Sequence, residues 1–196
     1  MFLDLKLGLL WAVVVGIAFH EPITVSWILA SILFAFLPDI DFWVELARRG
    51  TVGGKTLGDH RTLLHAPLLY LPAAVGMWWW LGPAWATLFS IGVFGHHIHD
   101  TMGMGFGVRW LFPFSKNFYK IFSDKEGNIF YDREHLRITS WNPEELRVVL
   151  QEKGNDHWLQ EDLAYARKHA FSTAARLFFS ALLFLIVLVL LHMRSK

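Results

Sequence analysis

Residues 84–100, AWATLFSIGVFGHHIHD, join a long apolar run to a cluster of ionisable side chains at its end. The predicted span, Ala84–His99, is somewhat shorter than the ~20 residues that a membrane-spanning helix needs. Ionisable residues at a membrane boundary are costly to bring together unless a cation or a reaction requires them. This stretch therefore predicts a membrane helix that ends at a metal-type site.

The rest of the chain also has the composition of a membrane protein, because 54% of its 196 residues are hydrophobic. Tight turns at residues 20–22 and 82–83 join neighbouring apolar segments, which predicts two helical hairpins. We expect an all-α, polytopic bundle of about five transmembrane helices. The expected spans are Leu5–Phe19, Ile23–Leu37, Ala66–Leu81, Ala84–His99 and Ala174–His192.

A polar stretch between the fourth and fifth predicted spans has the features of a small α+β domain. Asn142 followed by Glu145 is a helix start, and residues 156–168 read as a second amphipathic helix. Gly127-Asn128 suggests a short hairpin between residues 121–122 and 129–131. We expect a transmembrane region at 1–115, a polar cytoplasmic domain at 116–173 and a C-terminal transmembrane helix at 174–196.

Positive residues predict the orientation, since cytoplasmic loops carry an excess of Lys and Arg. The other side of the predicted topology holds little beyond Arg194 and Lys196, whereas one side carries Lys6, Arg48, Arg49, Lys55, Arg61, Arg109, Lys116 and Lys120. This side would face the cytoplasm of a bacterial inner membrane, in a multi-pass protein. Cleavage of a signal peptide after Gly16-Ile17-Ala18 is an alternative for the first segment, and it leaves the sidedness unchanged. The net charge of +1 gives no electrostatic case for nucleic acid as a partner.

The chain has no cysteine, so His, Asp and Glu must build any metal site. His96 and Asp100 are four residues apart at the end of a helix, which stacks their side chains on one face. His99 lies about 60° to the other side of that face, and His97 is a weaker candidate because it points about 100° away. The alternative is a helix end whose histidines reach the interface or bind carbonyl groups.

Asp39 and Asp41 follow Leu37-Pro38, where the second predicted span should end. Proline disfavours helical geometry in the residue before it, so we expect an extended segment. Residues two apart then point to the same side, and both carboxylates could reach one centre. The alternative is that they only cap a following helix at residues 42–49.

His60-Arg61 and His65 precede the third predicted span. The two histidines are five apart, so they reach one centre if the segment is a loop or if a helix begins between them. Arg61 offers a planar group that matches a phosphate or carboxylate. The alternative is a cytoplasmic arginine between two interfacial histidines.

Together these three clusters resemble the YdjM-type bacterial inner-membrane proteins, which are described as membrane-bound metal-dependent hydrolases. The resemblance depends on Leu37-Pro38-Asp39-Ile40-Asp41, on His60-Arg61 with His65, and on His96-x-x-x-Asp100-Thr101 leading into residues 107–115. It covers roughly the first 115 residues. Thr62, Leu64 and Ala66 stand where the family pattern tends to have Gly, Thr and Ser.

The resemblance implies a hydrolase with one or two divalent ions, zinc or manganese, acting on an ester or phosphoester. The implied metal ligands are Asp39, Asp41, His60, His65, His96, His99 and Asp100. The implied catalytic residues are Asp41 as general base and Arg61 or Arg109 as the group that binds the developing anion.

All three clusters lie on the predicted cytoplasmic ends of the spans, at the level of the lipid headgroups. The expected partners are therefore the bilayer and a lipid-linked or small ester or phosphoester substrate. Two other classes stay open. A non-enzymatic scaffold would use the metal to join its helices, and a metal or proton transporter would also carry Asp and His in the membrane.

Overall fold

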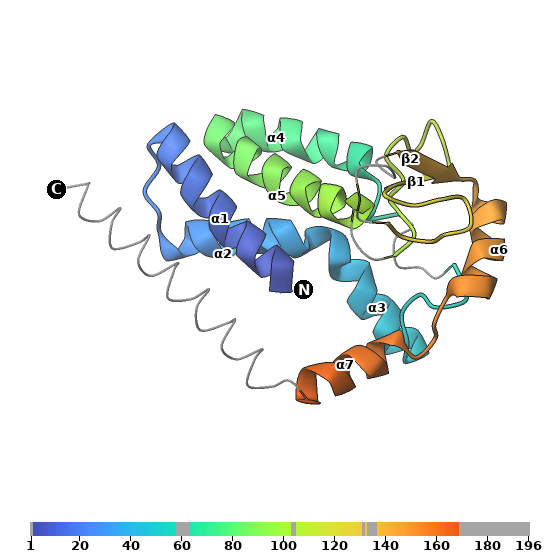
Figure 1. The fold of residues 1–196 in the computed structure, drawn as a ribbon. Coiled ribbons are helices and arrows are strands. Elements are labelled where there is room, and N and C mark those ends of the chain that lie inside the picture. Colours follow the sequence, from blue (N-terminus) through green and yellow to red (C-terminus); the bar gives the residue numbers. More distant parts are fainter. Residues whose placement is uncertain (1, 58–62, 103–104, 131, 133–136, 169–196) are drawn as a thin grey trace. The chain divides into compact units, whose positions relative to one another are not determined.

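The structure is a computed structural model that describes residues 2–57, 63–102, 105–130, 132 and 137–168. The chain divides into two compact units, residues 1–156 and 157–196. The elements of the described part (Figure 1) are α1 (Phe2–Phe19), α2 (Val25–Phe36), the 3₁₀ turn η1 (Leu37–Asp39), α3 (Ile40–Arg49), the 3₁₀ turn η2 (Pro67–Tyr70), α4 (Leu71–Leu81), α5 (Pro83–Met102), β1 (Phe118–Ile121), β2 (Ile138–Trp141), α6 (Pro143–Lys153) and α7 (Trp158–Lys168).

Two helical hairpins form the first unit's main core, as the short turns of the sequence predict. α1 packs on α2, α4 packs on α5, and α5 also lies against α1 and α2 (Figure 1). The buried side chains between these helices are Ala12, Val15, Trp27, Phe34, Tyr70, Ala84, Leu88, Phe89 and Val93. Helix α5 is therefore the element around which α1, α2 and α4 are arranged.

α1 and α2 lie in close contact at Gly8. A Cβ atom on Gly8 would lie 2.7 Å from Ile32 Cα, so no larger residue fits without movement. The hydroxyl of Ser31 donates to the Gly8 carbonyl at 2.6 Å, and Trp27 Nε1 donates to the Ala12 carbonyl at 2.8 Å. Small residues with polar groups between helices are typical of packing within membranes.

One helical stretch of the described residues, Val25–Arg49, is long and apolar enough to cross a membrane. It runs through α2, η1 and α3, so it continues past Leu37, where the sequence analysis ended the second span. The prediction of a five-span bundle is therefore wrong. The expectation of a mostly helical chain is confirmed for the described residues.

Helix length and polar content explain the difference. α4 has 11 residues, which is about 16 Å at a rise of about 1.5 Å per residue, whereas the bilayer core is about 30 Å thick. α1 has 18 residues, with Asp4 and Lys6 in its first half. The end of α5 carries three histidines and an aspartate. The fifth predicted span, Ala174–His192, lies outside the described residues.

The polar region after α5 forms a two-stranded antiparallel sheet covered by α6. Phe118 of β1 lies opposite Trp141 of β2, and both side chains are buried against α6. The predicted turn at Gly127-Asn128 is present, and the Asp124 carboxylate accepts from the backbone N–H of Asn128 at 2.8 Å. Only an isolated bridge joins Ser123 to Ile129, because the regular partner of β1 is β2.

The predicted helix start at Asn142 is confirmed as a capping box on α6. Asn142 Oδ1 accepts from the backbone N–H groups of Glu144 and Glu145, each at 2.9 Å. In return, Glu145 Oε2 accepts from the Asn142 N–H at 3.0 Å. This backbone hydrogen bond, helped by Lys125, holds the pKa of Glu145 below its usual value. The second predicted helix is also present, as α7.

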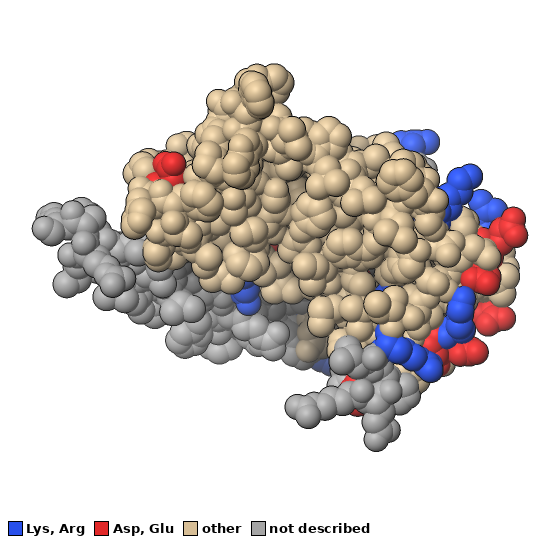
Figure 2. Space-filling view, turned by 90° about the horizontal axis from the view of Figure 1, so that it is seen from above, with Lys and Arg blue, Asp and Glu red and all other residues tan. Residues whose placement is uncertain are grey.

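Charged side chains are unevenly distributed over the first unit. Figure 2 shows Lys, Arg, Asp and Glu gathered over α6 and the sheet, whereas the surface over the helical hairpins is almost without charge. Several large apolar side chains of α2 and α4 are strongly exposed, including Val25, Val75, Trp79 and Trp80. Such an apolar surface fits a lipid environment better than water.

Candidate metal centre

Four side chains from three parts of the described chain converge at the end of α5. They are Asp39, His65, His96 and Asp100, and we call them the His–Asp group. Each offers one ligand atom, and these four atoms all lie within 4.8 Å of one another. The side chains of His65 and His96 are almost fully buried, and that of Asp39 is 22% exposed. The His–Asp group could therefore hold a metal ion and is reachable from its Asp39 side.

Four N–O distances within the His–Asp group are close to those between the ligands of one ion. His65 Nε2 lies 3.5 Å from Asp39 Oδ1 and 3.1 Å from Asp100 Oδ2. His96 Nε2 lies 3.4 Å and 3.5 Å from the same two oxygens, without a hydrogen bond to any described residue. Ligands bound to zinc at about 2.0–2.1 Å lie about 3.3 Å apart on a tetrahedron.

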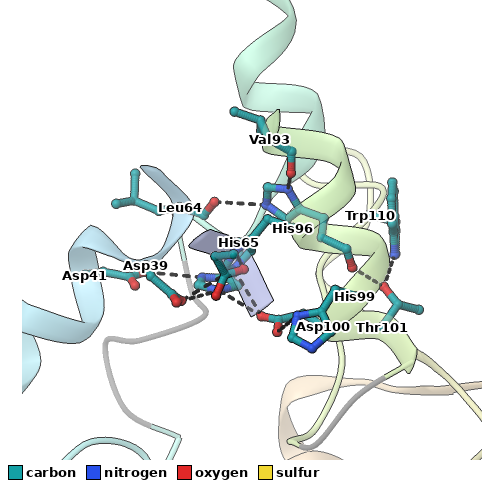
Figure 3. Close-up of polar contacts among 12 residues, drawn as sticks. Asp39, Asp41, Leu64, His65, Val93, His96, His99, Asp100, Thr101 and Trp110 are labelled. Atoms are coloured by element: carbon teal, nitrogen blue, oxygen red, sulfur yellow. Dashed lines mark hydrogen bonds and ion pairs between the residues drawn. The ribbon is translucent and has the colours of Figure 1, made fainter. Parts of the chain in front are cut away.

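Regular helical geometry in α5 brings His96 and Asp100 together. Their spacing of four residues places both side chains on one face of the helix, as predicted. Figure 3 shows the carboxylates of Asp39 and Asp100 approaching His65 from different directions, and both face its Nε2. The strongest geometric signal of the sequence thus lies at the centre of the site.

Asp39 reaches the site from a 3₁₀ turn, so the expected extended segment is wrong. Leu37 has φ −55° and ψ −40°, which is helical. Pro38 is tolerated because it stands in the first turn of η1, where its missing N–H has no helical partner to lose. Asp39 precedes α3, but its side chain makes no capping hydrogen bond there. Capping alone therefore does not account for Asp39.

Asp41 lies near the other nitrogen of the same imidazole. Its Oδ2 is 3.6 Å from His65 Nδ1, whereas the Asp39 carboxylate faces His65 Nε2 (Figure 3). Asp41 is not part of the His–Asp group. The two carboxylates that the sequence analysis treated as one pair thus meet opposite sides of His65.

Backbone contacts hold His65 in place just before η2. Its carbonyl accepts from the backbone N–H of Arg109 at 3.1 Å. The neighbouring Leu64 carbonyl accepts from the Tyr70 hydroxyl at 2.9 Å and lies 3.1 Å from His97 Nε2. Residues from α5, η2 and the segment after α5 therefore fix the loop that carries this imidazole.

The two other histidines of α5 lie outside the His–Asp group. His97 is buried, with Nδ1 2.7 Å from the Val93 carbonyl and Nε2 facing Leu64, so both nitrogens are directed at backbone. His99 is one-third exposed, and its Nδ1 lies 3.7 Å from Asp100 Oδ1, the oxygen on the far side of that carboxylate. The structure thus places His99, an expected ligand, beside the group rather than in it.

Arg109 is attached to the site through its backbone. Its N–H binds the His65 carbonyl, and its guanidinium stacks on the Phe112 ring at 4.1 Å. Partial burial lowers the pKa of this guanidinium. The other expected anion-binding residue, Arg61, and the expected ligand His60 lie outside the described residues.

A comparison with protein families agrees with the three motifs. The family model described as YdjM inner membrane protein matches residues 5–195. The chain belongs to the YdjM inner membrane protein family. The match confirms the resemblance inferred from the sequence, and the family description agrees with the expected inner membrane location. No curated protein and no solved structure matches the chain.

In this YdjM family member, sequence analysis missed one buried carboxylate at the site. Asp4 of α1 is 1% exposed, and its Oδ1 lies 2.9 Å from His96 Nδ1. The signal for it was an acidic residue in the first turn of a helix whose only other charged residue is Lys6. The contact itself depends on the packing of α1 against α5, which the sequence pattern did not predict.

Proposed function

We propose that this chain is a metal-dependent hydrolase of the inner membrane that cleaves an ester or a phosphoester. The observation that carries the proposal is the His–Asp group, in which four N–O distances of 3.1–3.5 Å connect two imidazoles and two carboxylates. Two carboxylates balance the charge of a divalent ion, and two imidazoles suit zinc better than magnesium or calcium. Zinc is therefore the first candidate and manganese the second.

Partial exposure of the site supports a catalytic rather than a purely structural metal. Structural zinc sites are closed, whereas catalytic sites keep an open position for water or substrate. In the His–Asp group the side chain of Asp39 is 22% exposed, and that of the neighbouring Asp41 is 14% exposed. When bound, a divalent ion supplies Lewis-acid chemistry that suits hydrolysis at neutral pH.

The other expected residues have roles that fit this proposal. We place Arg109, which is tied to His65, as the residue that binds the developing anion. Asp41 is the candidate general base, since its side chain is 14% exposed and its Oδ2 lies 3.6 Å from Nδ1 of the proposed ligand His65. Arg61 is a second anion-binding candidate, and His60 is a candidate ligand for a second ion. The headgroup region of the membrane makes a lipid-linked or small phosphoester the natural substrate class.

The test begins with metal content. We expect about one equivalent of zinc or manganese in the detergent-purified full chain, measured by elemental analysis, since the described group offers one set of four ligands. The His96→Ala/Asp100→Ala double variant should lose this metal but keep its helical circular dichroism. A metal-free, folded wild-type protein after incubation with zinc and manganese would refute the proposal.

Hydrolysis is tested on the metal-loaded protein. Phosphomonoesters, phosphodiesters, carboxyl esters and phospholipids in mixed micelles are offered to the wild type and to the double variant. Activity that is present in the wild type and absent in the variant would support the proposal. Tight metal binding with no hydrolysis of any of these classes would instead favour the structural scaffold.

A further inference from the structure

The Asp4 carboxylate is buried in a position where removing its charge from water costs free energy. It lies in the first turn of α1 and is 1% exposed, on the same helix face as the buried residues Ala12 and Val15 of the core. Burial of a charged carboxylate costs several kcal/mol unless hydrogen bonds compensate for the lost water. The contact of Asp4 with His96 at 2.9 Å is such a hydrogen bond.

The packing of α1 places Asp4 at this position. Gly8 lies one turn after Asp4, and the close contact of its backbone with Ile32 fixes α1 against α2. α1 also packs directly on α5, the helix that carries His96. The position of Asp4 is therefore set by a tight helix contact and not by a flexible chain end.

The hydrogen bond determines which nitrogen of His96 carries the proton. A carboxylate only accepts, so the imidazole must donate from Nδ1. A neutral imidazole protonated at Nδ1 has its lone pair on Nε2. Nε2 is the atom that faces Asp39 Oδ1 and Asp100 Oδ2 at 3.4 Å and 3.5 Å. The orientation and the tautomer thus both suit metal binding through Nε2.

We infer that Asp4 is a positioning residue that holds His96 with its Nε2 lone pair directed into the His–Asp group. This inference rests on the metal site of the proposed function. Partners of this kind fix ring orientation and raise ligand basicity, and their loss typically weakens metal binding by about 10–100-fold. The contact between Asp41 and His65 Nδ1 is less close, at 3.6 Å, beyond the usual hydrogen-bond range.

The first measurement is zinc affinity, by competition with a chromogenic chelator on the full chain in detergent. Asp4→Asn keeps the shape of the side chain but removes its charge, so zinc binding should weaken by about 10–100-fold. Lys6→Gln is the matched control, because it removes a charge from the same helix at an exposed position. Its affinity should equal that of the wild type. Equal affinity in Asp4→Asn would overturn the inference.

The second measurement separates positioning from a general effect on folding. In zinc-loaded protein with ¹⁵N-labelled histidine, the His96 proton should reside on Nδ1 and resonate far downfield in the wild type. In Asp4→Asn it should move upfield, since a neutral amide is a weaker acceptor than a carboxylate. A wild-type His96 protonated on Nε2 would overturn the inference whatever the variant does. Absence of zinc from the wild type would overturn the proposed metal site and, with it, this inference.

Discussion

His65 and His99 both lie near Asp100, but they contact different oxygens of its carboxylate. His65 Nε2 is 3.1 Å from Oδ2, which also faces His96, whereas His99 Nδ1 is 3.7 Å from Oδ1. An ion held by the His–Asp group would therefore meet His65 and not His99. The two histidines also differ in burial, because the side chain of His65 is inaccessible to solvent and that of His99 is one-third exposed.

This difference predicts the behaviour of two matched variants. Loss of a group that hydrogen-bonds to a metal ligand typically weakens metal binding by about 10–100-fold. His65→Ala should weaken zinc binding by more than this, because it removes a ligand itself. His99→Ala should leave zinc affinity within a few-fold of the wild type. Competition titration of both full-length variants against one chelator measures the two values. Equal losses in both would place His99 among the ligands and contradict the geometry described above.

Sequence reasoning at this scale worked where local geometry was sufficient. His96 and Asp100 share a face because any regular helix places residues four apart together. Asp39 was identified from its motif, although the segment that carries it is the 3₁₀ turn η1 and not the extended segment that was expected. Asp4 was missed because its partner is 92 residues away, and only the packing of α1 on α5 connects the two. The expected metal roles of these residues remain predictions until an ion is measured.

At the scale of elements, the contact between α1 and α2 at Gly8 sets the position of the first helix. A side chain larger than hydrogen would meet the Ile32 backbone at 2.7 Å, and backbone cannot move aside as a side chain can. We expect Gly8→Val to reduce the free energy of unfolding by about 1–3 kcal/mol through overpacking. Denaturant unfolding in detergent, followed by circular dichroism, measures this loss.

Gly76→Ala in α4 is the control for that prediction. A Cβ at Gly76 would meet only the flexible Trp80 ring, at 3.4 Å, which is close to an ordinary contact. Because alanine favours helix by up to about 1 kcal/mol over glycine, the stability should stay the same or rise slightly. If Gly8→Val were as stable as this control, the close contact of α1 and α2 would not exist in solution.

Elements were harder to predict wherever a residue tolerates two geometries. Pro38 disfavours a helical Leu37 on average, but η1 accommodates it and lets the chain stay helical from α2 into α3. Apolar composition alone also overestimated the spans, since residues 66–70 form a turn and leave α4 with 11 residues. The partner of β1 is non-local, which a turn signal at Gly127-Asn128 does not reveal.

At the scale of the whole molecule, the His–Asp group joins segments that are distant in sequence. Its four members come from η1, from the loop before η2, and from α5. A ligand that binds only the folded chain raises the free energy of unfolding, by about 2.7 kcal/mol at a concentration one hundred times its Kd. Zinc should therefore stabilise the first unit as a whole and not one helix.

Thermal unfolding in detergent with and without zinc measures this stabilisation. The midpoint should rise with zinc for the wild type and fall again when a chelator removes the ion. The His96→Ala/Asp100→Ala variant should unfold at the same temperature under both conditions. An equal rise in that variant would mean that zinc acts at another part of the chain.

None of the four residues of the His–Asp group comes from the polar region after α5, but backbone hydrogen bonds connect this region to His65. Val108 exchanges two backbone hydrogen bonds with Tyr119 of β1, at 3.0 Å and 2.8 Å, and the next residue, Arg109, donates to the His65 carbonyl. The backbone groups of these two consecutive residues thus connect the sheet to a buried imidazole. We expect a displacement of the sheet to reach His65 through these backbone hydrogen bonds, in addition to the direct contact between β1 and α5.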